Sequence, residues 1–271
     1  MPTIHLNGTH LYYEDTGPGS TGQTVVFSHG LLWNTELFAP QIAALRGRYR
    51  CVAWDHRGQG RSAADRRGCI GMELVWQDAV ALLEHLDPGP VHFCGLSMGG
   101  FVGMRVAARR PELLCSLMLL ETSADPEPEE NVGKYRLLTL ATRALGPGAV
   151  AAKVLPILFG KSFVQDPTRQ QERDRFVEIL KARRDIWRAV QGVIDRAGVH
   201  DELRLIKAPT LVLVGDEDVA TTPAKARRIH EAIQGSTLVQ IARAGHSSTV
   251  EQPAAVTAAL ETFLASVHSA G

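Results

Sequence analysis

Short apolar runs alternate with longer segments of helical periodicity through most of this 271-residue chain. Most of the runs are continuous rather than alternating in polarity, as is typical of strands that are covered on both faces. Alternation of this kind predicts an α/β fold: a mainly parallel, eight-stranded sheet with helices on both faces and ligands at the carboxyl ends of the strands. The expected strands are Thr3 to Leu6, Thr9 to Glu14, Thr24 to Ser28, Arg50 to Trp54, Val91 to Cys94, Cys115 to Leu120, Thr210 to Val214 and Ser236 to Ile241.

The first two strands are expected to form a hairpin. Asn7 and Gly8 lie between them and supply the positive-φ residues that a tight antiparallel turn needs. Helices are predicted between and after the remaining strands, over Leu37 to Leu45, Met72 to Leu86, Gly99 to Arg109, Pro223 to Ile233 and Pro253 to Val267.

One interval breaks this rhythm. About ninety residues between Leu120 and Thr210 have helical periodicity and no convincing strand, and a structureless loop of that length is implausible in a compact domain. We therefore predict a core of residues 1–124 and 204–271, with a helical cap inserted at residues 125–203. Its segment from Thr168 to Arg188 is rich in Arg and Lys, which fits either a solvated helix face or a surface that binds carboxylates.

The composition narrows the possible partners. The chain carries 29 basic and 29 acidic side chains, so no basic field exists to attract nucleic acid or an anionic membrane. It lacks a stretch of 18 apolar residues and the features of a signal peptide, so we expect cytoplasmic residence. The four cysteines form no CxxC pair, and His230-Glu231 is not followed by a second His at the HExxH spacing. We accordingly expect no metal site.

The strongest local signal is Gly95-Leu96-Ser97-Met98-Gly99-Gly100, which directly follows a predicted strand and precedes a predicted helix. A serine on a sharp turn between strand and helix needs small residues two positions away on either side, because larger side chains would collide with the turn. The amino terminus of the helix also favours developing negative charge. Ser97 is therefore the candidate nucleophile.

A serine hydroxyl needs a base, usually an imidazole that an acid holds in place. His246 follows Ala244-Gly245 just after the last predicted strand, on a loop at the strand-end edge. The acid is expected at the end of another strand, where Asp216, Glu217 and Asp218 compete. We favour Asp218, which lies beyond the tight turn, and expect Asp216 to cap that turn. The resulting order is Ser97, Asp218, His246.

These segments together resemble the α/β-hydrolase family over nearly the whole chain outside the cap. The resemblance rests on His29-Gly30-Leu31, Asp55 to Ser62, the turn around Ser97, Gly215 to Asp218 and Gly245-His246. It implies that the backbone N–H groups of Leu31 and Met98 form an oxyanion hole. It also implies that His29 shapes its loop and that Asp55 and Arg57 brace the loops around the site.

Within that family, three segments resemble the 3-oxoadipate enol-lactonases and the small carboxylesterases: Gly245 to Pro253, Gly95 to Gly103 and Glu121 to Ala124. This resemblance implies hydrolysis of a small-molecule ester or lactone through an acyl-enzyme, with no cofactor. Five residues are candidates for the substrate pocket, although packing within the cap explains its own members equally well: Leu32, Trp33, Leu137, Phe159 and Trp187.

The sequence leaves three other functions open for the same three side chains. These are carbon–carbon bond hydrolysis, cofactor-free perhydrolysis of the haloperoxidase type and, in a different class, ligand sensing by a receptor built on a hydrolase scaffold.

Overall fold

A single eight-stranded sheet runs through the computed structural model, which describes residues 3–63, 68–86, 88–182 and 185–269. The strand order is β1-β2-β4-β3-β5-β6-β7-β8. The β1–β2 and β2–β4 pairs are antiparallel and all other neighbours are parallel, which confirms the predicted fold class. The strands are β1 Thr3–Leu6, β2 Thr9–Asp15, β3 Thr24–Ser28, β4 Arg50–Trp54, β5 Val91–Leu96, β6 Leu114–Leu120, β7 Thr210–Gly215 and β8 Thr237–Ile241.

The strands follow the apolar runs closely. Every residue of β5 and β7 is buried, as expected for strands covered on both faces. Asn7 and Gly8 have φ values of 45° and 73°, so the predicted hairpin turn is confirmed. The differences are confined to the ends of strands, where β6 begins one residue earlier than expected and β8 one residue later.

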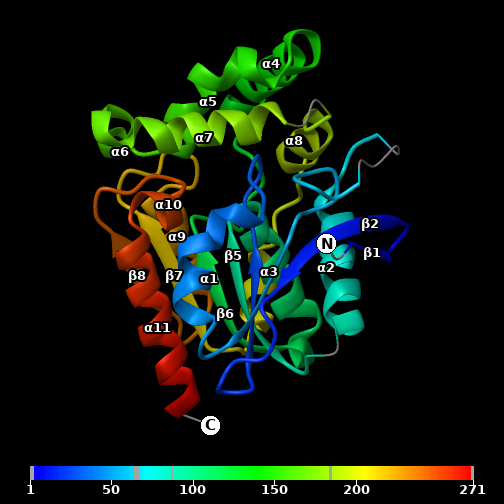
Figure 1. Ribbon diagram of the computed structural model, residues 1–271, viewed down its shortest axis with the longest axis vertical. Helices are drawn as coiled ribbons and strands as arrows, with labels where there is room; N and C mark the ends of the chain where they lie inside the picture. Colours follow the sequence, from blue (N-terminus) through cyan, green and yellow to red (C-terminus); the bar gives the residue numbers. More distant parts are fainter. Residues whose placement is uncertain (1–2, 64–67, 87, 183–184, 270–271) are drawn as a thin grey trace.

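Helices cover both faces of the sheet (Figure 1). One face carries α2 Met72–Leu86, α3 Met98–Arg109 and α9 Pro223–Ala232, and the other carries α1 Ala39–Leu45 and α11 Pro253–Ser269. Helix α1 starts two residues later than predicted, because the 3₁₀ turn Thr35–Phe38 precedes it and Pro40 lies in its first turn. Across the described residues, no helix has both the length and the apolar character needed to span a membrane.

In the part of the chain that the structure describes, five α-helices are inserted between β6 and β7, and we call the segment between these two strands the cap. The helices are α4 Glu129–Leu145, α5 Ala151–Leu158, α6 Lys161–Gln165, α7 Gln170–Lys181 and α8 Trp187–Ile194. Figure 1 shows them lying across one end of the sheet. Basic side chains at and near α7 tie the cap to the core: Arg169 donates to the carbonyl oxygens of Val250 and Glu251, and Arg175 forms an ion pair of 2.6 Å with Glu36.

Candidate active site

Ser97 lies on a sharp turn between β5 and α3. Its φ of 53° is unusual for a residue with a side chain, and its N–H is held by the Leu120 carbonyl at 2.9 Å. A Cβ added at Gly95 would lie 2.3 Å from the Gly99 carbonyl oxygen, and one added at Gly99 would lie 1.9 Å from that of Ser28. The two glycines that flank the serine are therefore required by contacts with neighbouring backbone.

His246 and Asp218 come together from the loops that follow β8 and β7. Nδ1 of His246 donates to Oδ2 of Asp218 at 2.9 Å. The Thr221 hydroxyl donates to the same oxygen at 2.8 Å and lies 3.1 Å from Nδ1. Burial alone would raise the pKa of Asp218, but His246 and the hydrogen bonds from Thr221 hold this pKa below its ordinary value. Asp218 is thus an ionised partner for the imidazole.

The neighbouring carboxylates that competed for this role are used elsewhere. Asp216 accepts a hydrogen bond from the Ala244 amide at 3.4 Å, on the turn where a capping role was expected. Glu217 accepts from the amide and the hydroxyl of Ser162 at 2.8 and 2.6 Å, which connects the β7 loop to α6 of the cap. Asp218 is therefore the carboxylate of this loop that reaches His246.

The loop after β3 presents the Leu31 amide through a fixed backbone. The His56 amide donates to Nε2 of His29 at 3.0 Å, so the other ring nitrogen, Nδ1, carries the proton and donates to the Gly30 carbonyl at 2.7 Å. Burial lowers the pKa of His29, which keeps the ring neutral. Because the Gly30 carbonyl is held, the peptide that carries the Leu31 N–H is held too.

The two amides that the family resemblance implies for the oxyanion hole have no partner among the residues that the structure describes. Within the described residues, the N–H groups of Leu31 and Met98 donate no hydrogen bond. Met98 is the first residue of α3, where amides point out of the helix. Both amides are free to receive an oxyanion.

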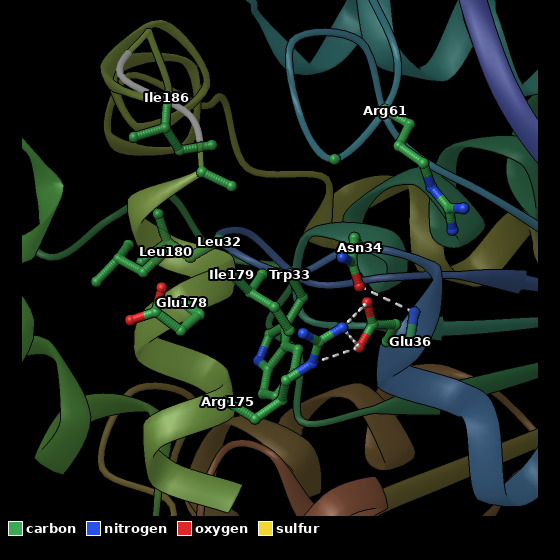
Figure 2. A pocket seen from close by; sticks show the side chains of 12 residues that line it. Leu32, Trp33, Asn34, Glu36, Arg61, Arg175, Glu178, Ile179, Leu180 and Ile186 are labelled. Carbon is green, nitrogen blue, oxygen red and sulfur yellow. Dashed lines mark hydrogen bonds and ion pairs between the residues drawn. The ribbon is translucent and has the colours of Figure 1, made fainter.

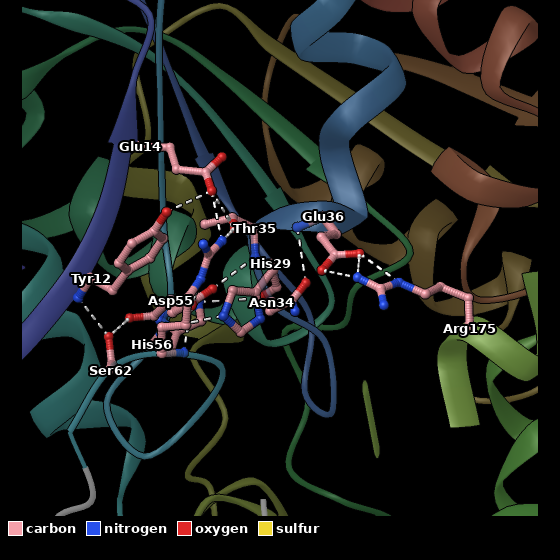
Figure 3. Close-up of polar contacts among 11 residues, drawn as sticks. Tyr12, Glu14, His29, Asn34, Thr35, Glu36, Asp55, His56, Ser62 and Arg175 are labelled. Atoms are coloured by element: carbon pink, nitrogen blue, oxygen red, sulfur yellow. Dashed lines mark hydrogen bonds and ion pairs between the residues drawn. The ribbon is translucent and has the colours of Figure 1, made fainter. Parts of the chain in front are cut away.

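Figure 3 shows polar contacts that connect the loop after β3 with the loop after β4. Asp55 accepts hydrogen bonds from the amides of Thr35 at 2.8 Å and Arg61 at 2.7 Å, so one carboxylate joins two loops. Arg57 donates from Nε to the buried Asp78 of α2 at 2.7 Å. This geometry agrees with the bracing role expected for Asp55 and Arg57.

Ser97 and His246 line one cavity of about 140 Å³ beneath the cap. In the described part of the chain they share no hydrogen bond, which is common before a substrate is bound. Its core side also includes Leu31, Leu32, Phe101, Ala220 and Thr221. Its cap side is mostly apolar and includes Leu138, Val150, Val154, Ile157, Leu158, Leu180, Ile186, Trp187, Val190, Val193 and Ile194.

The structure separates the five residues proposed for the substrate pocket. Leu32 and Trp187 line the cavity. Trp33 and Phe159 instead pack around Phe176 in an aromatic cluster, with ring centroids 5.0 and 5.3 Å from that of Phe176. Leu137 does not line the cavity: it lies on the outer face of α4 with 68% of its surface exposed.

A second, larger cavity of about 320 Å³ lies between the loop after β3 and α7 (Figure 2). It contains neither Ser97 nor His246, so its size does not make it the centre of chemistry. Leu32, Leu180 and Ile186 line both cavities and form the partition between them.

Two buried carboxyl groups near the site were not singled out from the sequence. Glu251 of α10 (Ser248–Glu251) accepts from the amides of Gly160, Gly245 and Ser247 at 2.8, 3.0 and 3.1 Å, and burial raises its pKa to about 7. Glu121 is fully buried after β6, and burial holds its pKa well above the ordinary value. Both lay within segments that carried the family resemblance, Glu251 in Gly245 to Pro253 and Glu121 at the start of Glu121 to Ala124. Thr221, which donates to Asp218, belongs to no sequence motif.

The described residues contain no group of three or more His, Cys, Asp or Glu side chains that could hold a metal ion.

Comparison with known proteins identifies a matching family and similar hydrolases. The model of the family described as serine aminopeptidase, S33 matches residues 19–253. The chain is 28% identical to 3-oxoadipate enol-lactonase 2 of Acinetobacter baylyi, over 97% of this chain and 98% of the relative. Among solved structures it is similar to a thermophilic esterase from Thermogutta terrifontis, with 29% identity, a TM-score of 0.90 and coverage of 99% and 100%. It is also similar to the enol-lactonase from Burkholderia xenovorans LB400, with 29% identity, a TM-score of 0.88 and coverage of 97% and 100%.

Proposed function

Because this chain belongs to the serine aminopeptidase S33 family of α/β-hydrolases, we propose that it hydrolyses small carboxylic esters or lactones through an acyl-enzyme on Ser97. The observation that carries the proposal is the buried Asp218–Thr221–His246 network, which opens onto the same cavity as Ser97. Relatives named as an esterase and as enol-lactonases support this substrate class.

In the proposed reaction, Oγ of Ser97 attacks the carbonyl carbon while Nε2 of His246 takes its proton. Asp218 orients the imidazole and stabilises its protonated form. The amides of Leu31 and Met98 receive the oxyanion, and loss of one such donor typically costs about 2.7 to 4 kcal/mol. His246 then returns the proton to the leaving alcohol, and a water molecule activated in the same way releases the acid.

The cavity supports a preference for small acyl groups. Its volume of about 140 Å³ is below the usual range of about 300 to 1,000 Å³ for ligand pockets, and its cap side is mostly apolar. We propose that the inserted segment, residues 125–203, acts as a cap domain that selects the substrate, and that the core, residues 1–124 and 204–271, supplies the chemistry.

The test compares wild type with Ser97→Ala on p-nitrophenyl butyrate and on δ-valerolactone, following acid release by pH-stat. Wild type should turn over repeatedly, and Ser97→Ala should lose about 10⁴-fold or more of kcat. Ser266→Ala on α11 is the matched control and should retain the wild-type kcat, since the Ser266 hydroxyl donates to the Phe263 carbonyl of its own helix. Equal rates in wild type and Ser97→Ala would exclude Ser97 as the nucleophile. A single turnover per molecule would indicate a ligand sensor instead.

A further inference from the structure

The mostly apolar cap side of the active-site cavity contains one charged pair and one phenol. Glu127 precedes α4, Tyr135 lies within α4, and Arg196 follows α8, so three separate segments bring these side chains to the same cavity. Burying polar groups costs free energy unless they are paired, so a cluster of this kind in an apolar wall calls for an explanation. Neither the proposed triad nor the oxyanion hole uses it.

Arg196 is buried but only partly engaged. Its side chain is 3% exposed, and Nη1 donates to Glu127 and to the Val193 carbonyl, each at 2.8 Å. Nε donates to the Asp125 carbonyl at 3.2 Å. In the described part of the chain, Nη2 has no hydrogen-bond partner. The guanidinium is thus fixed on one side, with a donor left over in a residue that lines the cavity.

Tyr135 provides a second unused donor. Its hydroxyl makes no hydrogen bond to any described residue, although the side chain lines the cavity. Burial, reinforced by the negative charge of Glu127, raises the pKa of Tyr135 to about 12. The phenol therefore keeps its proton at neutral pH and is available as a hydrogen-bond donor.

The cluster and the candidate nucleophile line the same cavity. The Arg196 guanidinium carbon is 4.5 Å from the centre of the Phe101 ring, and Phe101 also lines the cavity. Phe101 lies one helical turn after Ser97, and its amide donates to the Ser97 carbonyl at 3.0 Å. A group a few bonds away from a carbonyl bound at Ser97 would reach this wall.

Charge decides which ligand such a wall favours. The positive charge of Arg196 is already balanced by Glu127 at 2.8 Å, and a substrate carboxylate would bring a second negative charge into a buried site with one cation. The wall can still donate hydrogen bonds from Nη2 of Arg196 and from the hydroxyl of Tyr135. A neutral acceptor oxygen meets both donors without adding charge.

We propose that Tyr135 and Arg196 form a subsite that binds a neutral carbonyl oxygen, of a ketone or an amide, on the acyl part of the substrate. The inference rests on the proposed ester or lactone hydrolysis and names the substrate class within it. Glu127 sets the selectivity of the subsite, because its carboxylate neutralises the guanidinium and disfavours anionic substrates.

Three p-nitrophenyl esters of equal chain length test the subsite: the pentanoate, the 4-oxopentanoate and the succinate monoester. The first is apolar, the second places a ketone oxygen at the fourth carbon, and the third replaces the terminal methyl of the second by a charged oxygen. Spontaneous hydrolysis is measured in buffer without protein and subtracted, and Ser97→Ala is assayed on all three esters to show which turnover depends on Ser97. Wild type should show kcat/KM for the oxopentanoate about tenfold above the pentanoate, and the succinate monoester should be the poorest of the three.

Two variants separate the donors from the charge. Tyr135→Phe removes only a hydroxyl that has no protein partner, and should bring the ratio of oxopentanoate to pentanoate about fivefold closer to one. Tyr13→Phe on β2, away from the cavity, is the matched control and should leave that ratio unchanged. Glu127→Gln keeps the shape but uncovers the positive charge of Arg196, so the ratio of succinate monoester to oxopentanoate should rise about tenfold.

Equal kcat/KM for pentanoate and oxopentanoate in wild type, with turnover that depends on Ser97, would overturn the subsite and leave the proposed hydrolase function standing. A wild-type preference for the succinate monoester would overturn the neutral class. Ester hydrolysis that does not depend on Ser97 would overturn the proposed function, and the subsite with it.

Discussion

On the core wall of the candidate active-site cavity, backbone contacts and side-chain hydrogen bonds fix the residues, whereas the cap wall is built mostly from apolar side chains. On the core side, Gly99 lies so close to the Ser28 carbonyl that no Cβ fits, and hydrogen bonds fix Asp218 to His246. On the cap side, mostly apolar residues from four helices line the same space. Because such contacts tolerate little change, we propose that the core wall sets the chemistry and that the more tolerant cap wall selects the substrate.

The largest expected effect is on kcat and comes from a substitution in the core wall. Asp218→Asn should leave KM nearly unchanged and reduce kcat about 10⁴-fold, because the amide holds His246 in the wrong tautomer. Asp216→Asn, two residues earlier and exposed on the turn, should stay within about twofold of wild type. Steady-state kinetics on p-nitrophenyl butyrate measures both variants. Comparable losses in the two would show that the loop as a whole, rather than the Asp218 carboxylate, is needed.

A second contrast concerns stability. Gly99→Ala places a methyl group against the Ser28 carbonyl and should cost at least about 3 kcal/mol in unfolding free energy. Gly133→Ala on α4 of the cap meets no atom within 4 Å and should stabilise the protein by about 0.5 to 1 kcal/mol. Urea unfolding measures both. If Gly99→Ala were tolerated as well as Gly133→Ala, the core wall would not be set by backbone contact.

Glu251 joins the two walls and gives a pH dependence of known sign. Its pKa is about 7 in the folded protein against an ordinary value of 4.5, so the folded state binds more protons between these pH values. The stability that this proton provides is present below about pH 4.5 and lost as pH rises through about 7.

Thermal and urea unfolding of wild type and Glu251→Gln at pH 5 and pH 8 test this dependence. Wild type should lose on the order of 2 kcal/mol more than the variant over that interval. Asp218 is present in both proteins, whereas the negative charge of Glu251 helps to raise the pKa of Glu121, so the difference between the two proteins includes that coupling. Parallel pH profiles for the two proteins would contradict the assignment to Glu251.

The smallest effect is expected on the cap wall. Val190→Ala on α8 enlarges the cavity and should raise kcat/KM for p-nitrophenyl hexanoate relative to the acetate about threefold, because a longer acyl chain gains room. Val177→Ala on α7 removes the same two methyl groups from a partly buried residue that packs against the cluster around Phe176 and does not line the cavity, and it should not change this ratio. A change in kcat for both esters at Val190→Ala would show that the cap also takes part in the chemistry.

The residues of the core wall could be predicted from the sequence because tight backbone contacts require particular residue types. Gly95 and Gly99 are glycines for steric reasons that the structure shows directly, and they mark Ser97 without any knowledge of the rest. Asp218 and His246 follow the ends of strands, where loops of a parallel sheet converge. Thr221 escaped notice because a threonine three residues after an aspartate belongs to no motif.

The cap wall was predicted poorly because helical periodicity shows which residues share a face, but not which face turns toward the cavity. On α4, Tyr135, Leu138 and Thr142 share the face that lines the cavity, and Leu137 lies on the opposite side. The hydrophobicity of Leu137 does not predict burial here, because Leu140 on the same helix is also largely exposed. Two partners of Arg196, Asp125 and Glu127, lie about 70 residues earlier in the chain, so no local sequence pattern indicates the pairing.

The most direct test asks which atom becomes covalently modified. Wild type, Ser97→Ala and His246→Ala are treated with diethyl p-nitrophenyl phosphate, and intact mass followed by peptide mapping locates the adduct. We expect one diethylphosphoryl group per wild-type chain, on the peptide that contains Ser97, with slow labelling of His246→Ala and none of Ser97→Ala. Labelling of Ser97→Ala to the same extent, or an adduct on Ser247 or Ser248 instead, would contradict the assignment of Ser97 as the nucleophile.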